Sequence, residues 1–273
     1  SSEEVKIKIG FIGLGNMGGS LARLVAQDER YRSELLLANR SRDKAEKIAA
    51  EVGGQPVSNE EVFAQAEVIF LGIKPAQFTD LLAEYQEILE KRESILLVSM
   101  AAGLSLKILE KLTPSHHRWI RMMPNTPVAV GEGVITYALS QQANQVDEDL
   151  LRDLLSSAGL LVRLEEKQLD AATALAGCGP AFVYLFIEAL ADAGVRAGLS
   201  RDISLELANQ TLLGAAKLSR VSGQHPAQLK DQVCSPAGST IAGVASLEEN
   251  SFRGTVMDAV QAAYKRTQEL GKK

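Results

Sequence analysis

The sequence has few of the residues that build metal sites and disulfide frameworks. Its 273 residues include two cysteines, Cys178 and Cys234, and three histidines. There is no Cys-x-x-Cys motif, and the histidines are too few and too poorly spaced to bind a metal. The sequence therefore predicts reduced thiols, as in a cytoplasmic protein, and no metal site.

Large blocks of one charge and long apolar stretches are also missing. The 29 basic and 34 acidic residues leave a net charge of −5, without a basic cluster, which argues against nucleic-acid binding. We find no apolar run of membrane-spanning length, and the segment SSEEVKIKIG lacks the basic-then-apolar pattern of a secretory signal. The sequence thus predicts a globular cytoplasmic protein that does not associate with membranes or nucleic acid.

Short apolar runs alternate with helical patterns over roughly the first 165 residues. Near-continuous apolar strands separated by helices are typical of a parallel sheet covered on both faces. We therefore predict an α/β fold in which residues 1–164 form a Rossmann-type, doubly wound, NAD(P)-binding domain. The predicted strands are Val5–Gly13, Leu35–Ser41, Ala66–Lys74, Ser94–Ala102, Arg118–Pro124 and Gly133–Leu139, with helices including Arg42–Glu51 and Pro75–Lys91 between them.

Only helical patterns follow from Lys167 onward, so we predict an all-α domain over residues 165–273. Its segment AFVYLFIEALADAGVRAG carries three charged residues, Glu188, Asp192 and Arg196, which are four apart and form one narrow stripe. Every other face of this helix is apolar and needs cover. A partner subunit is the simplest source of that cover, and the centre of a monomeric bundle is the alternative.

A glycine-rich turn, GFIGLGNMGGSLARLV, follows the first predicted strand and opens an amphipathic helix. Gly13, Gly15 and Gly18 satisfy Gly-x-Gly-x-x-Gly. In this motif the first glycine allows a tight turn, the second lets a pyrophosphate approach the backbone, and the third lets helix and strand pack closely. The helix N-terminus then faces the phosphates. An ordinary strand–turn–helix loop is the alternative, but the context favours dinucleotide binding.

The end of the second predicted strand distinguishes between the two nicotinamide cofactors. An NAD site usually has an acidic residue there, whereas this chain has Asn39, Arg40 and Ser41. A guanidinium group and two neutral donors can hold a 2′-phosphate, which favours NADP. The alternative is that Arg40 simply begins the next helix.

Three further segments should reach the same edge of the sheet, because ligands of open α/β sheets bind at the carboxyl ends of the strands. Lys74 and Pro75 end one strand, and the small residues Ala101–Gly103 follow the next and can accommodate a nicotinamide ring. The Pro124–Pro127 turn follows another strand, and its Asn125 can offer an amide to nicotinamide or substrate. A purely structural turn is the alternative.

A second glycine-rich turn lies in the helical half, where Ser235, Gly238, Ser239 and Thr240 precede an apolar helix. Hydroxyls and amides at a helix N-terminus form an anion pocket, and three hydroxyls exceed what capping requires. We therefore favour a carboxylate site over simple capping. The sequence offers no His–Asp pair, glutamate cluster or Ser–His–Asp order. Reduction of a protonated C=N bond by a nicotinamide cofactor needs little beyond positioning, whereas alcohol oxidation needs a base.

Over essentially its whole length the sequence resembles the pyrroline-5-carboxylate reductase family. The resemblance implies an NAD(P)H-dependent oxidoreductase that reduces (S)-1-pyrroline-5-carboxylate to L-proline, the last step of proline biosynthesis, with NADPH favoured and NADH left open. It also implies a homodimer with interleaved helices, which can assemble into a homodecamer. The motifs that carry it are GFIGLGNMG, VIFLGIKP, RMMPNTPVAVGEG, ALAGCGPAFVYLFIEALADAGVRAGL and LKDQVCSPAGSTIAGVASLE.

The resemblance also implies roles for individual residues. The pyrophosphate would be bound by Gly13, Leu14, Gly15, Asn16, Met17 and Gly18, the 2′-phosphate by Asn39, Arg40 and Ser41, the adenosine ribose by Asn59, and the nicotinamide half by Ile73, Lys74, Pro75, Ala101, Ala102 and Gly103. The substrate carboxylate would be held by Ser235, Gly238, Ser239 and Thr240, with the Thr240 hydroxyl on the ring nitrogen as the catalytic group. Ala237 stands where other members can have a second glycine, and we expect no role to change.

Two other functions share parts of this pattern. A β-hydroxyacid dehydrogenase has a similar plan but uses a lysine of the helical domain as general acid and base; the candidates Lys167, Lys217 and Lys230 do not lie in the glycine-rich, asparagine-containing helix that this requires. A redox-sensing regulator would bind NADP(H) without turnover and would have no need of a second anion pocket. The sequence therefore favours the imine reductase.

Overall fold

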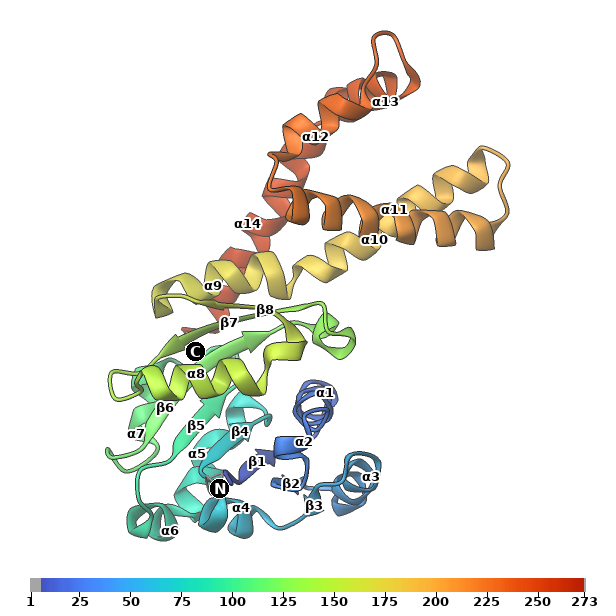
Figure 1. Cartoon of the computed structure of the whole chain (residues 1–273). Coiled ribbons are helices and arrows are strands. Elements are labelled where there is room, and N and C mark those ends of the chain that lie inside the picture. Colours follow the sequence, from blue (N-terminus) through green and yellow to red (C-terminus); the bar gives the residue numbers. More distant parts are fainter. Residues whose placement is uncertain (1–5, 273) are drawn as a thin grey trace. The chain divides into compact units, whose positions relative to one another are not determined.

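The computed structural model describes residues 6–272 (Figure 1), which divide into two compact units. The first unit runs to Gly177 and resumes at Tyr264, and the second is Cys178–Ala263. The boundary predicted after residue 164 lies at the change from strands to helices, since the last strand of the described residues ends at Arg163.

An eight-stranded sheet forms the centre of the first unit, in the order β3-β2-β1-β4-β5-β6-β7-β8. All neighbouring pairs are parallel except β6 and β7, so the doubly wound fold is confirmed but a fully parallel sheet is not. The strands are β1 (Ile9–Ile12), β2 (Leu35–Ala38), β3 (Gln55–Pro56), β4 (Val68–Leu71), β5 (Leu96–Ser99), β6 (Arg118–Pro124), β7 (Gly133–Leu139) and β8 (Gly159–Arg163).

Alternate residues of the strands supply two apolar layers, one on each face. Ile9 and Phe11 pack with α1 (Asn16–Val25), α3 (Arg42–Val52) and α8 (Gln145–Leu154) on one face. Ile12 packs on the opposite face. The helices of that face are α4 (Asn59–Gln65), α5 (Phe78–Glu84), α6 (Gln86–Lys91) and α7 (Leu106–Lys111). Both faces of the sheet are therefore covered (Figure 1), as the continuous apolar strands predict.

Several boundaries differ from the predictions. The predicted strand Val5–Gly13 begins outside the described residues. The single helix predicted at Pro75–Lys91 is three elements, η1 (Pro75–Gln77), α5 and α6, because the backbone leaves the helical region at Tyr85. The remaining short elements of the unit are α2 (Glu29–Arg32), η2 (Thr126–Val130), η3 (Ser156–Ala158), η4 (Glu166–Gln168), α9 (Leu169–Ala172) and η5 (Thr173–Gly177).

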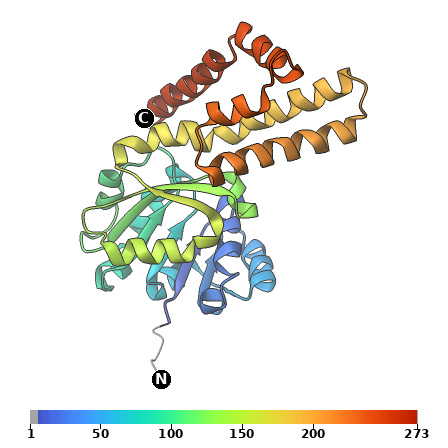
Figure 2. The same cartoon turned by 45° about the horizontal axis from the view of Figure 1, so that its top comes forward.

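The second unit is entirely helical within the described residues. Its helices are α10 (Gly179–Arg196), α11 (Arg201–Ser222), α12 (Pro226–Val233), α13 (Ser239–Glu249) and the first part of α14 (Phe252–Leu270). The helices α10 and α11 lie side by side as an antiparallel pair (Figure 2). Their close approach depends on Gly194, where an added Cβ would lie 2.5 Å from Ser204 Oγ.

Many apolar side chains of the second unit are exposed in the single chain. Leu185 is 66% exposed and Tyr184 59% exposed on α10, and Leu213 and Leu218 are each 59% exposed on α11. A soluble helix pair does not leave faces of this extent in water without a partner. The wide apolar face predicted from the sequence is therefore present on this helix pair, and it is exposed to solvent in the single chain.

One helical run passes a length-and-composition test for a membrane span. Glu166–Arg196 covers 31 residues, and the most apolar window within it has a mean hydropathy of 1.7 and is 11% buried. The expectation that no apolar run reaches this length is therefore wrong. It failed because the charged residues are spaced widely enough along the run for such a window to remain apolar on average.

Candidate functional site: a cofactor cavity and a hydroxyl-rich turn

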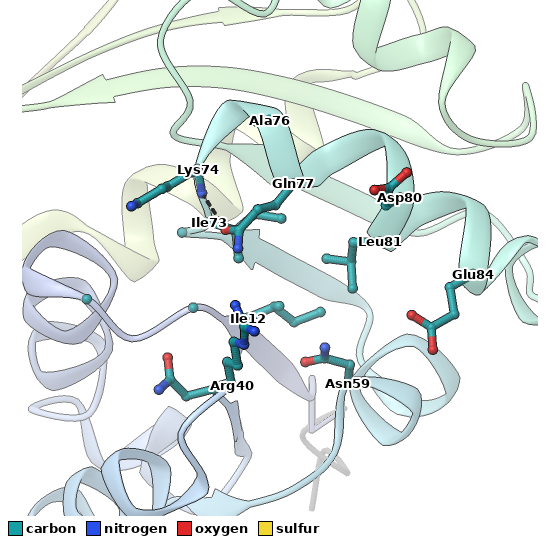
Figure 3. Close-up of a pocket in the computed structure, with 14 residues that line it drawn as sticks. Ile12, Arg40, Asn59, Ile73, Lys74, Ala76, Gln77, Asp80, Leu81 and Glu84 are labelled. Atoms are coloured by element: carbon teal, nitrogen blue, oxygen red, sulfur yellow. Dashed lines mark hydrogen bonds between the residues drawn. The ribbon is translucent and has the colours of Figure 1, made fainter.

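A cavity of about 520 Å³ lies at the carboxyl ends of the central strands (Figure 3). The chain winds from β1 toward β3 on one side and from β4 toward β8 on the other, so β1 and β4 flank the point where the winding direction reverses. Ligands of doubly wound folds bind at this point. The lining residues are Ile12, Gly13, Gly15, Asn39, Arg40, Asn59, Gly72, Ile73, Lys74, Ala76, Gln77, Asp80, Leu81 and Glu84.

The three glycines of the first turn have different surroundings. Gly13 has φ +91°, and a Cβ there would lie 2.5 Å from Gly72 O. At Gly18 a Cβ would lie 2.1 Å from Gly13 O. At Gly15, by contrast, a Cβ would meet no atom within 4 Å. The chain itself requires the first and third glycines, while the second leaves open space beside the N-terminus of α1, as pyrophosphate binding demands.

Asn39 fixes this turn to the end of β2. Its Oδ1 accepts a hydrogen bond from the Leu14 N–H at 2.9 Å, and its Nδ2 donates to Ser41 O at 3.0 Å. Both ends of the amide are thus used within the chain. The side chain lines the cavity, but these bonds favour a positioning role, and direct contact with a 2′-phosphate stays a prediction.

Arg40 is free to receive a phosphate at the rim of the cavity. It is exposed, and no ion pair or hydrogen bond is found for its side chain within residues 6–272. The next arginine, Arg42, is occupied, with Nε 3.5 Å from Glu46 Oε1 and Nη2 donating to Pro56 O at 3.3 Å. Ser41 precedes α3 without a side-chain capping bond. A free cation and a free hydroxyl therefore stand where the sequence predicts the 2′-phosphate.

Asn59 and Lys74 lie on opposite sides of the cavity (Figure 3). Asn59 is the first residue of α4, and the capping box of that helix uses Ser58 and Glu61 instead. The Lys74 N–H donates to Gln77 Oε1 at 3.1 Å, which shapes the turn after β4. The backbone around Lys74 is therefore fixed, and within residues 6–272 no ion pair is found for its ammonium group.

The sequence reasoning missed the wall formed by η1 and α5. Gln77, Asp80, Leu81 and Glu84 all line the cavity, and Figure 3 shows the Asp80 and Glu84 carboxylates on the side away from Lys74. Their spacing of three to four residues places them on one helix face. That spacing was a usable signal, but it also fits an ordinary solvated helix surface.

Other predicted cofactor residues lie outside this cavity. Pro75 begins η1, and Ala101–Gly103 follow β5, one strand further along the sheet. Gly103 has φ +79°, and the Ala101 N–H donates to Ser99 Oγ at 3.1 Å. The nicotinamide half of the predicted site is therefore divided: Ile73 and Lys74 line the cavity, whereas Pro75 and Ala101–Gly103 lie next to it.

Asn125 is used inside the chain. Its Oδ1 accepts from the Val134 N–H at 2.7 Å and its Nδ2 donates to Ala176 O at 3.0 Å, and the residue is only 8% exposed. Both ends of the amide are engaged, which favours the structural-turn alternative over a direct contact with nicotinamide or substrate.

The hydroxyl-rich turn of the second unit leads into α13. Gly238 is the residue before the helix, and no side chain caps the amides of the first turn. Ser235, Ser239 and Thr240 are exposed, and we find no hydrogen bond from their hydroxyls in the described chain. Since capping accounts for none of the three hydroxyls, the arrangement favours an anion-binding turn. Ala237 takes φ +57°, the conformation that a glycine would adopt without strain.

Within residues 6–272 no group of three or more His, Cys, Asp or Glu side chains could hold a metal ion. The candidate lysines are also unremarkable in their surroundings. Lys167 pairs with Glu165 at 3.1 Å and Lys230 with Asp231 at 3.6 Å, and the Lys167 side chain is 80% exposed. Neither side chain is buried in the way that a general base usually is.

The doubly wound sheet, the glycine turn at the reversal point and the following helical unit define the class of the chain as a dinucleotide-binding protein with the plan of an NAD(P)H-dependent oxidoreductase. Comparisons with known proteins agree. A family model described as "Pyrroline-5-carboxylate reductase dimerisation" matches residues 166–270, and one described as "NADP oxidoreductase coenzyme F420-dependent" matches residues 8–103. The helical half is thus a dimerisation domain, which accounts for its exposed apolar faces.

Full-length relatives identify the family. Pyrroline-5-carboxylate reductases of Glycine max and Pisum sativum are 45% and 44% identical, over 96% of this chain and 95% of theirs. The solved reductase of Coxiella burnetii has a TM-score of 0.90 at 30% identity, and that of Plasmodium falciparum, with NADP bound, 0.84 at 39% identity; each comparison covers 97% of this chain and 98% of the other. The chain belongs to the pyrroline-5-carboxylate reductase family.

Proposed function

We propose that the chain catalyses the NADPH-dependent reduction of the C=N bond of (S)-1-pyrroline-5-carboxylate to L-proline, the last step of proline biosynthesis. The observation that carries the proposal is the turn before α13, where three hydroxyls and the amides of the first helical turn have no side-chain cap. The full-length relatives named above support it, since they bear the name of this reaction.

The first unit holds the cofactor. The open space at Gly15 admits the pyrophosphate to the N-terminus of α1, and Arg40 with Ser41 binds the 2′-phosphate. Asn39 acts behind them by bonding the Leu14 amide, so that the glycine turn and the end of β2 keep a fixed separation. When bound, the cofactor supplies the hydride.

The turn before α13 holds the substrate. The amides of Ser239 and Thr240 point from the N-terminus of an 11-residue helix, where the partial positive charge favours a carboxylate. The Ser235 hydroxyl adds a donor from the other side of the turn; a Cβ at Gly238 would lie 2.4 Å from its Oγ, so only glycine leaves that hydroxyl its place. The carboxylate fixes one end of the ring.

Thr240 acts at the ring nitrogen, which is bonded to the carbon that bears the carboxylate. The ring nitrogen enters protonated and its N–H donates to the Thr240 hydroxyl oxygen. The C=N bond is therefore already polarised toward nitrogen. Hydride addition to the ring carbon turns the π electrons of the C=N bond into a lone pair on nitrogen. This amine then takes one proton from solvent to give zwitterionic L-proline. No general base is needed, which fits the absence of a buried acid–base pair in the second unit.

We further propose that the protein is cytoplasmic, does not bind membranes, and assembles beyond the dimer into a decamer. The low cysteine content supports a reducing compartment. The exposed apolar side chains on α10 and α11 support burial between subunits rather than in lipid, because the same two helices carry an exposed ion pair between Asp192 and Arg201. Light scattering of the purified protein distinguishes a dimer from a decamer.

The test of the reaction is to incubate the protein with NADPH and pyrroline-5-carboxylate, and to measure loss of NADPH absorbance together with L-proline formed. We expect one proline for each NADPH oxidised. A redox-sensing regulator would bind NADPH without turnover, and a hydroxyacid dehydrogenase would instead act on 3-hydroxy acids with NAD(P).

The role of Thr240 is tested with a matched pair of variants. Thr240→Ala should lower kcat/KM by about tenfold to a thousandfold, the range for a lost transition-state hydrogen bond. Thr240→Ser keeps the hydroxyl and should retain most of the activity. Wild-type turnover in Thr240→Ala would show that this hydroxyl does not contact the ring nitrogen.

A further inference from the structure

A buried arginine in the middle of β6 has no part in the site described above. Arg121 is 7% exposed, and in the parallel pairing of β5 and β6 it lies beside Ser99, the last residue of β5. It is therefore level with the point where the chain leaves β5 for the Ala101–Gly103 loop.

Two carboxylates neutralise Arg121. Its Nη1 donates to Glu166 Oε2 at 3.3 Å, and its Nη2 lies 3.9 Å from Asp170 Oδ1. Glu166 and Asp170 are four residues apart on η4 and α9, so they share one face. Its Nε is buried with no hydrogen-bond partner within the described chain. A guanidinium group so desolvated is stable only while its partners stay in place, so the cluster has little freedom to shift.

Glu166 extends this cluster to the nicotinamide-side loop. The same Oε2 atom accepts a hydrogen bond from the Leu106 N–H at 2.7 Å, and Leu106 is the first residue of α7. At the other end of the loop the Ala101 N–H donates to Oγ of fully buried Ser99. Side-chain acceptors therefore hold the loop at both ends. Arg121 lies beside Ser99 in the sheet and orients Glu166 through their ion pair.

We propose that Arg121 is a positioning residue for hydride transfer, which acts through Glu166 to fix the Ala101–Leu106 loop against the nicotinamide half of the cofactor. This inference rests on the proposed function. Arg121 touches neither cofactor nor substrate in this role. Its importance comes from the sensitivity of the reaction to geometry, since a displacement of about 1 Å at the reacting atoms can cost about a hundredfold in rate.

The test compares Glu166→Leu with Glu166→Gln. Glutamine keeps an oxygen that accepts from the Leu106 N–H, whereas leucine removes it. We expect Glu166→Leu and Arg121→Met to lower kcat by about tenfold to a hundredfold, and Glu166→Gln to retain most of it. The Kd for NADPH, measured by fluorescence titration, should change little in all three variants, because the phosphate contacts lie elsewhere. This split between kcat and Kd separates positioning from loss of binding.

Arg118→Met is the matched control on the same strand. Arg118 forms a two-pronged ion pair with Asp147 of α8, at 2.8 and 2.9 Å, and makes no bond to the Ala101–Leu106 loop. It should lower the thermal midpoint at least as much as Arg121→Met while leaving kcat unchanged. The proposal is overturned if Glu166→Leu keeps the wild-type kcat, or if Arg118→Met loses as much kcat at the same residual stability.

The outcomes also separate this inference from the proposed function. If wild-type protein does not reduce pyrroline-5-carboxylate, the proposed function fails. The positioning role is still tested in that case by the emission spectrum of bound NADPH, which reports the surroundings of the nicotinamide ring. Glu166→Leu should shift that spectrum and Arg118→Met should not, and an unchanged spectrum in Glu166→Leu contradicts the proposal.

Discussion

Two glycines of one turn should respond in opposite ways to the same added methyl group. At Gly18 the new Cβ would lie 2.1 Å from Gly13 O, and at Gly15 it would meet no protein atom within 4 Å. Gly18→Ala should therefore damage the fold, whereas Gly15→Ala should damage only cofactor binding.

The structure gives the size of each effect. Helix α1, which carries Gly18, cannot easily move away from the Gly13 carbonyl, because Leu21 and Ala22 of α1 are fully buried. Gly18→Ala should cost about 3 kcal/mol, the upper end of overpacking penalties. Gly15 has φ −65° and ψ −168°, an extended conformation that alanine adopts freely, so its cost in stability should stay below about 1 kcal/mol. Loss of one charge-assisted phosphate hydrogen bond, about 1.5–3 kcal/mol, weakens NADPH binding by about tenfold to a hundredfold.

The measurement is thermal unfolding without cofactor, followed by fluorescence titration with NADPH. Gly15→Ala should unfold near the wild-type temperature and bind NADPH poorly, and Gly18→Ala should unfold early. Wild-type NADPH affinity in Gly15→Ala would mean that no pyrophosphate approaches this turn, which would refute the account of the cavity.

Three further predictions concern cofactor choice, pH and strain. Arg40→Ala should raise KM for NADPH by about tenfold, the loss of one phosphate contact, and leave KM for NADH unchanged; an unaltered preference would exclude Arg40 from the 2′-phosphate site. Burial lowers the pKa of His117 below its ordinary value, because desolvation disfavours the charged ring and outweighs the hydrogen bond to Leu89 O, which raises the pKa. The unfolded chain then binds more protons, so stability is full above about pH 6.5 and falls as the pH drops below it; thermal midpoints of His117→Gln should depend less on pH than those of the wild type or the exposed control His116→Gln. Ala237→Gly should raise the free energy of unfolding by up to about 1 kcal/mol, since Ala237 has φ +57°, and a lower thermal midpoint would show that the turn is not strained.

The main elements of the fold could be predicted because burial leaves a strong pattern. The strands β6 and β7 begin and end at the residues predicted from their apolar runs. The strand β3 was missed because two residues carry no periodicity, and β8 because its five residues, GLLVR, are partly exposed. The antiparallel direction of β7 was also missed, since a strand buried on both faces shows the same composition in either direction.

The cofactor turn could be predicted because its motif is local, whereas the remaining contacts depend on distant partners. Asn39 and Asn125 lie at the carboxyl ends of the strands, as expected, but the side-chain amide of each is hydrogen-bonded to backbone groups of the chain. The role of Arg121 could not be predicted from the sequence, because it depends on Glu166, which is 45 positions away. It also depends on the hydrogen bond that Glu166 accepts from the Leu106 N–H. Hydrogen bonds of this range leave no periodic signal.

The most direct test of the central claim is to follow the hydride itself. The claim is that the nicotinamide cofactor passes its hydride directly to the C=N carbon of pyrroline-5-carboxylate. With NADPH dideuterated at C4 of the nicotinamide, L-proline should carry one deuterium on the ring carbon that was double-bonded to nitrogen, in every molecule formed. Proline without that deuterium, or no proline at all, would contradict the account.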